Sequence, residues 1–329
     1  MRFNRFDGGW SAFLLQSRVS PVSRPAMLIM SALIVVGLIA SQATHFTLTT
    51  LPNASMLIVG IVALDAATLL FPQTRIVQTV QVCLYGFLYL VTTCLVGVLA
   101  AYALQRMDLP LRDDLFNRLD LALGFDWSAY AHWVDRHAQV QKLFVFAYNT
   151  ISLQIAFPLV VLAFAHRATE TRTYLLAFTI AFVTTIVTSA VLPAAGPIVF
   201  INPADFTLLQ FTGATPVEQL MRLRQPVPFV MMDSPGGIAT FPSFHAAVAV
   251  LTPLTLRRFP RIFTGLLVLD ALMLCATLTE GAHYFVDLLA GGTMAVASHA
   301  LAMKIITFED RNRFTAAAES AADRGPART

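Results

Sequence analysis

Long apolar stretches recur along the chain, each about as long as a helix that crosses a lipid bilayer. Such a helix needs roughly 20 consecutive, mostly apolar residues. By this criterion the sequence predicts eight spans, at residues 26–46, 52–72, 77–104, 143–165, 173–193, 242–256, 262–279 and 284–304. The pattern therefore predicts an all-α integral membrane protein, a helical bundle of about eight transmembrane helices.

The composition agrees with lipid as the main solvent. Of the 329 residues, 57% are hydrophobic and 12% are charged, whereas about a quarter of the residues are charged in an average soluble domain. The formal net charge of +3 is small, so we expect no nucleic-acid partner. Cys83, Cys94 and Cys275 lie apart in apolar stretches, which argues against a disulfide framework or a zinc site.

The basic residues predict the orientation of the spans. Cytoplasmic loops of membrane proteins carry an excess of Lys and Arg. If the N-terminus is cytoplasmic and the spans alternate, 15 of the 22 Lys and Arg residues fall on the cytoplasmic side and 7 on the other side. We therefore expect both termini in the cytoplasm, and we expect the membrane to be a bacterial inner membrane.

Two extracytoplasmic segments are too long to be simple turns. Residues 105–142 mix charges with Trp127, Tyr130 and Trp133, a pattern typical of amphipathic helices in the headgroup zone. Residues 194–241 are rich in Pro and Gly. Long irregular loops often carry functional sites, so we expect substrate specificity to depend on both segments.

The motif FPSFH, residues 241–245, stands at the predicted outer end of the sixth span. Pro242 suits the first position of a helix, because the N–H that it lacks would have no partner there. The other free N–H groups of a first turn favour a bound anion. Ser243 and His245 lie within this turn and are candidates for a phosphate site.

The motif GAHYFVD, residues 281–287, opens the eighth span at the same predicted face. His283 and Asp287 are four residues apart and so share one face of a helix. A carboxylate at this spacing can accept the proton of one imidazole nitrogen, which leaves the other nitrogen as a nucleophile. Two histidines and an aspartate could instead bind a metal, but we expect no metal and no cofactor.

Each of these residues also has a simpler interpretation as an ordinary polar residue at a membrane interface. Ionisable groups at span ends that face a bundle are, however, functional candidates by default. Both motifs fall at one depth on one side of the membrane, although the orientation was derived from Lys and Arg alone. Their agreement favours a shared site.

Together the two motifs resemble the second and third signature motifs of the PAP2 (type 2 phosphatidic acid phosphatase) superfamily. The form G-x-H-Y-x-x-D is similar to the Aur1-like branch, which contains the inositol phosphorylceramide synthase-like proteins. The resemblance implies that His283 attacks phosphorus and that Asp287 orients it. It also implies that His245 protonates the departing oxygen and that Ser243 holds phosphoryl oxygens.

The chain departs from the superfamily pattern in its basic residues. The first motif, K-x6-R-P, is missing, and Thr277 stands where the third motif carries Arg. A phosphoryl transition state needs nearby positive charge. We therefore predict a phosphate-binding role for Arg224, with Arg222 as its substitute.

With this resemblance the chain divides into four parts. These are a cytoplasmic N-terminal segment (1–25), two additional transmembrane helices (26–72), a six-helix PAP2-like catalytic core (77–304) and a cytoplasmic tail whose composition predicts disorder (305–329).

The predicted function is that of a membrane lipid phosphatase or phosphotransferase. It would act on a lipid phosphate or phosphodiester through a phosphohistidine intermediate at the extracytoplasmic face. The lipid could be prenyl, glycerol or ceramide based, and an alcohol could act as acceptor. Two alternatives stay open: a transporter, although no inverted repeat is detectable, and a catalytically silent lipid-binding relative, which the missing Lys and Arg suggest.

Overall fold

The computed structural model describes residues 22–43, 46–48, 59–60, 63, 74–209, 214–225, 229–231 and 237–323, and this part of the chain is almost entirely helical. Its α-helices are α2 (Arg24–Ala43), α4 (Arg75–Gln105), α5 (Asp113–Ala122), α6 (Trp127–Asp135), α7 (Ala138–Asn149), α8 (Ile151–Phe164), α9 (Ala168–Val191), α10 (Ala214–Leu223), α11 (Phe244–Leu256), α12 (Pro260–Glu280) and α13 (Phe285–Asp323). Two 3-10 turns, η1 (Pro197–Phe200) and η2 (Pro203–Asp205), follow α9. Two short parallel strands, β1 (Phe46–Leu48) and β2 (Phe229–Met231), pair with each other.

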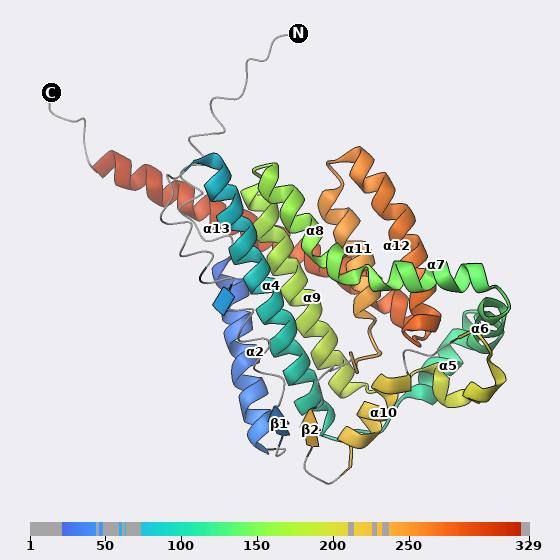
Figure 1. The fold of residues 1–329 in the computed structure, drawn as a ribbon. Helices are drawn as coiled ribbons and strands as arrows, with labels where there is room; N and C mark the ends of the chain where they lie inside the picture. Colours follow the sequence, from blue (N-terminus) through green and yellow to red (C-terminus); the bar gives the residue numbers. More distant parts are fainter. Residues whose placement is uncertain are drawn as a thin grey trace.

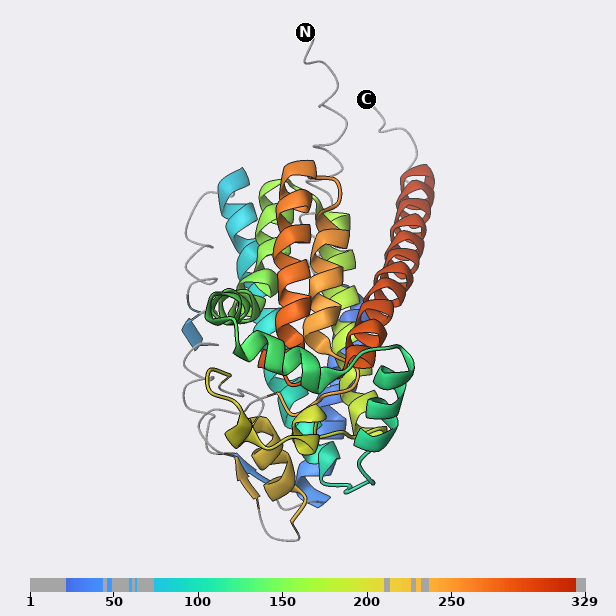
Figure 2. The ribbon, with the colours of Figure 1, turned by 90° about the vertical axis from the view of Figure 1, so that its right-hand side faces the viewer.

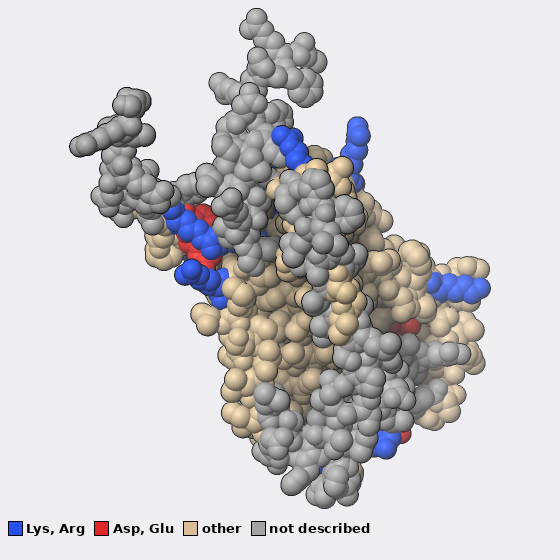
Figure 3. Space-filling view, turned by 60° about the vertical axis from the view of Figure 1, so that its left-hand side comes forward, with Lys and Arg blue, Asp and Glu red and all other residues tan. Residues whose placement is uncertain are grey.

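Several of the described helices have the length and composition of membrane spans. Four of them qualify: α4, α9, α12 and the Phe285–Arg313 part of α13. The α7–α8 pair would be a fifth, while α2 and α11 are shorter apolar helices. A broad area of the face in Figure 3 carries neither basic nor acidic side chains among the described residues. The prediction of a helical membrane protein is thus confirmed, while the number of eight spans stays a prediction.

Two predicted segments fall mostly outside the described residues. The second span, 52–72, is described only at residues 59–60 and 63, and the N-terminal segment 1–25 only from residue 22.

The predicted fourth span, 143–165, is broken near its start. α7 ends at Asn149, α8 begins at Ile151, and the two helices are bent by 48°. Thr150 lies at the break, where its hydroxyl donates to the carbonyl of Ala147 at 2.6 Å. A Thr side chain that bonds to its own preceding turn bends a helix. As a result α7 runs across the bundle and packs against α12, while α8 stands upright (Figure 1).

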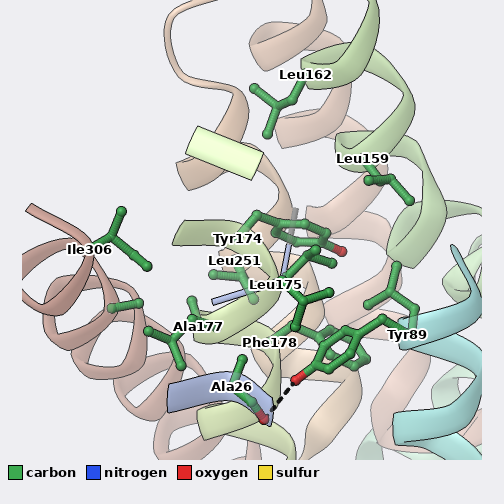
Figure 4. Packing of buried hydrophobic residues seen from close by; sticks show 14 of the residues in the cluster. Ala26, Tyr89, Leu159, Leu162, Tyr174, Leu175, Ala177, Phe178, Leu251 and Ile306 are labelled. Atoms are coloured by element: carbon green, nitrogen blue, oxygen red, sulfur yellow. Dashed lines mark hydrogen bonds between the residues drawn. The ribbon is translucent and has the colours of Figure 1, made fainter. Parts of the chain in front are cut away.

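α9 is the central helix of the bundle. It packs against α4, α13, α2, α8 and α11, and Tyr174, Leu175 and Phe178 are fully or almost fully buried in the core cluster shown in Figure 4. In the same cluster the Tyr89 hydroxyl donates to the Ala26 carbonyl at 3.3 Å. This bond joins α4 to α2.

The C-terminal tail is more ordered than its composition predicts. Residues 305–323 continue α13 as a helix, whereas the composition predicts a disordered tail over 305–329. Arg172, which is buried at the start of α9, forms ion pairs with Glu309 and Asp310. These contacts hold the continuation of α13 against the bundle.

One end of the bundle gathers the elements that form the candidate site. α4, α9 and α12 end there, α11 and α13 begin there, and α5, α6 and α10 lie beside these helix ends (Figures 1 and 2). The two motifs are therefore at one end of the molecule.

Candidate active site

His245 and His283 lie on the wall of a cavity of about 320 Å³. Their ring centroids are 6.4 Å apart and their planes are inclined by 62°. His245 belongs to the first turn of α11, whereas His283 lies in the short turn between α12 and α13. The structure thus brings together two histidines that are 38 positions apart in the sequence.

His283 and Asp287 form the predicted pair. The Nδ1 atom of His283 lies 3.1 Å from Oδ2 of Asp287, and the same oxygen accepts the N–H of Tyr284 at 3.0 Å. When Asp287 is ionised its oxygen can only accept, so Nδ1 then carries the proton and Nε2 keeps its lone pair. Asp287 is fully buried, so it can hold the imidazole in one orientation.

The burial of His283 also favours its neutral form. Burial lowers the pKa of the imidazole to about 4, and a hydrogen bond with the Thr240 backbone opposes this shift in part. A histidine with a lowered pKa is neutral at pH 7 and has a free electron pair, as a nucleophile requires.

Ser243 is the N-cap of α11. Its hydroxyl oxygen accepts the N–H of Ala246 at 3.3 Å, and its own N–H donates to the carbonyl of Asp287 at 3.0 Å. The helix therefore begins at Phe244, and Pro242 precedes the cap instead of taking the first helical position. The Ser243 side chain is fully buried and is not among the described residues that line the cavity. Its predicted phosphate contact stays a prediction.

Arg222 lies in the last turn of α10, and Arg224 directly follows this helix. The Arg224 guanidinium forms a 2.8 Å ion pair with Asp108 and donates to the Leu109 carbonyl at 2.5 Å. Arg222 is exposed. Neither arginine is among the described residues that line the cavity, and their phosphate-binding role stays a prediction.

Three buried aspartates of the 105–142 segment hold the loops around the site. Asp113 accepts the N–H groups of Ala195 and Gly196 at 3.0 and 2.8 Å, and it accepts the Tyr284 hydroxyl at 2.9 Å. Asp120 accepts the N–H of Phe285. The sequence analysis missed both residues, although Asp113 and Asp120 are seven positions apart and so share one helix face.

Asp135 has a similar role one helix later. It accepts the N–H groups of Thr207, Leu208 and Leu209. Burial alone would raise the pKa of Asp135, but these hydrogen bonds lower it below its ordinary value. An ionised Asp135 thus fixes the loop after α9 to α6.

Aromatic side chains of α6 bind the C-terminal end of α12. The Trp127 indole N–H donates to the Leu278 carbonyl at 2.7 Å, and the Tyr130 hydroxyl donates to the Cys275 carbonyl at 3.0 Å. The Leu278 carbonyl is one of the last four of α12, which have no intrahelical partner. The amphipathic segment therefore supports the site directly.

The polar end of the cavity contains two further residues. The Tyr148 ring stacks on His245 with centroids 4.2 Å apart and planes inclined by 13°. Glu280, which is 3% exposed, ends α12 beside the same cavity. The sequence analysis passed over Glu280, whose signal is an acid at the end of an apolar helix.

The comparison with known families agrees with this geometry. A family model of the PAP2 superfamily matches residues 115–301, which is more than half of the chain. The chain belongs to the PAP2 superfamily. No curated protein and no solved structure matches it.

The matched region of this PAP2 protein runs from α5 into α13 and contains both motifs. It begins later than the predicted core, which starts at residue 77. Membership of the superfamily indicates phosphatase-type or phosphotransferase activity. Within the described part of the chain, no group of three or more His, Cys, Asp or Glu side chains is placed to hold a metal ion.

Proposed function

We propose that this protein cleaves or transfers a phosphate-linked group of a membrane lipid through a phosphohistidine on His283. The observation that carries the proposal is the buried His283–Asp287 pair facing His245 across one cavity. Nucleophile, orienting carboxylate and acid–base partner are the groups that a two-step phosphoryl transfer requires.

In the first step Nε2 of His283 attacks phosphorus, and the bond from phosphorus to the lipid oxygen breaks. His245 gives a proton to the departing oxygen. Asp287 stabilises the positive charge that develops on the imidazole. In the second step His245 takes a proton from water or from an alcohol, whose oxygen then attacks phosphorus and releases His283.

The apolar part of the cavity supports a lipid as the substrate. It is lined from α4, α9 and α10, by side chains that include Phe182, Ile186 and Leu220. A substrate with one end at the histidines could place its apolar part along these residues. The lipid could be prenyl, glycerol or ceramide based.

The site would face the extracytoplasmic side, because the excess of Lys and Arg falls at the other predicted face. The missing first-motif Lys and third-motif Arg, together with the HY-x-x-D form, favour the Aur1-like branch and transfer to an alcohol over simple hydrolysis. Thr277, at the position of the missing Arg, is buried and donates to the Met273 carbonyl at 2.7 Å.

The test is turnover of a lipid panel by the purified protein and by His283→Asn. We expect release of phosphate, or a new phospholipid that needs a hydroxyl acceptor, and a loss of about 10²–10⁴-fold or more in the variant. Quenching with alkaline detergent during turnover should trap ³²P on wild-type protein only, because a phosphohistidine is stable in base and labile in acid. Full activity of a folded His283→Asn protein would refute the mechanism, and no product with any lipid would favour the transporter or the silent relative.

A further inference from the structure

The cavity has an unusual charge composition for a site that binds phosphate. Among the described residues that line it, Glu280 carries the one carboxylate, and none is Lys or Arg. The undescribed stretches of the adjacent loop, 210–213, 226–228 and 232–236, contain no Lys or Arg either. The basic residues nearest in the sequence to the lining are Arg222 and Arg224, two and four positions after Leu220, and Arg106, four positions after Tyr102. None of the three is among the described lining residues, and Arg224 is paired with Asp108.

This composition disfavours a doubly charged phosphomonoester. Two like charges at contact distance repel strongly where water is largely excluded. A dianion between the histidines would face the Glu280 carboxylate, and no Lys or Arg of the described lining would offset the two charges. A phosphodiester has a single negative charge, and a diester with its own cation would be neutral overall.

Glu280 also stands where a helix favours a cation. It is the last residue of α12, and the C-terminal end of a helix carries partial negative charge. A carboxylate at this place adds to that charge. A bound ammonium group would offset both the carboxylate and the helix end.

Aromatic rings line the cavity that contains this carboxylate. Tyr102, Tyr148 and Phe244 line the same cavity as Glu280, and Tyr148 interacts electrostatically with Glu280. Alkylammonium groups bind to the faces of aromatic rings, and a carboxylate in the same site adds Coulomb attraction for their positive charge. The chemistry of this wall therefore matches an organic cation.

We infer that the substrate is a zwitterionic phosphodiester lipid with an alkylammonium headgroup, and that Glu280 binds the ammonium while the phosphate lies between His245 and His283. The inference rests on the proposed function. Attack by His283 would break the bond between phosphorus and the oxygen that joins it to the lipid backbone, such as a diradylglycerol. This oxygen takes a proton from His245, and the lipid leaves as an alcohol. The ammonium-bearing phosphoryl group would stay on His283 until water or an alcohol takes it, with its proton going to His245.

The first test compares lipids of identical acyl chains with ethanolamine, choline or glycerol headgroups, and phosphatidate. We expect wild-type kcat/KM to be highest for an ammonium-bearing diester. Glu280→Gln should lower it by about 30-fold for that lipid, as for a buried charge pair that loses one partner. The glycerol diester should be affected much less. Glu218→Gln, the same change at an exposed carboxylate of α10, is the matched control.

The second test needs no turnover. Glycerophosphoethanolamine and glycerophosphoglycerol are titrated into detergent-solubilised His283→Asn protein, and binding is measured by calorimetry. We expect the first ligand to bind more tightly, and Glu280→Gln in the same background to remove the difference. Equal binding of the two ligands, or equal losses for all lipids in Glu280→Gln, would overturn the inference. Retained activity of His283→Asn would count against the proposed mechanism instead.

Discussion

Asp120 accepts a hydrogen bond from the backbone N–H of Phe285 at 2.7 Å, although 165 positions separate the two residues. Its other oxygen accepts the N–H of Val286 at 2.9 Å. These N–H groups open α13 and have no partner inside the helix. Asp120 is thus an N-terminal cap that α5 supplies to α13. It fixes the start of this helix, which contains Asp287 and directly follows the turn that contains His283.

Asp120→Asn should weaken this cap, because it removes the negative charge and one acceptor oxygen. A capping side chain contributes about 0.5–2 kcal/mol, so we expect a lower Tm and a loss in kcat/KM of about tenfold. Asp114→Asn, at an exposed position of the same helix, is the control. If both variants behave alike, the cap does not position the site.

Gly291 allows α13 to pass close to the start of α11. A Cβ atom at this position would lie 2.1 Å from the Ser243 carbonyl oxygen. Gly291→Ala should therefore push the two helices apart, at a cost of about 1–3 kcal/mol, and separate His283 from His245. Gly265→Ala, where a Cβ would meet nothing within 4 Å, should keep both Tm and turnover. Normal activity of Gly291→Ala would show that the approach of the helices is not needed.

Arg224 can be tested for its two possible roles. If it only holds the loop through Asp108, Arg224→Ala and Asp108→Asn should lower the Tm alike and leave kcat little changed. If it stabilises the phosphoryl group, Arg224→Ala alone should lower kcat by about 10²-fold or more. Our sequence-based prediction favours the second result, and steady-state kinetics of both variants decides between them.

The acid limit of the pH profile follows from the burial of His283. This lowers its pKa to about 4, whereas an exposed histidine has a pKa of about 6.5. The nucleophile must be neutral, so it stays competent above its folded-state pKa and is lost as the pH falls through that value. The acid limb of kcat/KM, which reports ionisations of the free enzyme, should lie well below pH 6.5. A limb centred near 6.5 would contradict the burial argument.

Metal removal should leave turnover unchanged. A neutral His283 is itself the nucleophile, so the proposed steps need no metal-bound water. Dialysis against EDTA, followed by assay with and without added Mg²⁺ or Zn²⁺, measures this. Loss of turnover that added metal restores would refute the phosphohistidine mechanism.

Local features of the sequence were sufficient for much of the fold and for the histidine pair. Apolar length indicated α4, α9, α12 and α13, because a bilayer sets the length of a span. The spacing of His283 and Asp287 predicted that they lie together, but the predicted shared helix face is wrong. His283 precedes α13, and the turn before this helix brings its ring to Asp287. Ser243 before an apolar run marked the start of α11. Pro242 was expected at the first helical position, two positions after the place it takes, which is just before the Ser243 cap.

Only the tertiary structure decided which distant residues support the site. From the sequence alone, Asp113 and Asp120 are simply charges of an amphipathic helix. Their roles in the structure depend on backbone N–H groups that lie far along the chain. The bend at Thr150 depends on a hydrogen bond within a turn that apolar periodicity does not register. Glu280 became a candidate ligand for an ammonium group only because none of the described residues that line the cavity is Lys or Arg. Spacing along a helix is a local property, whereas the charge of a cavity is a sum over several helices that only packing brings together.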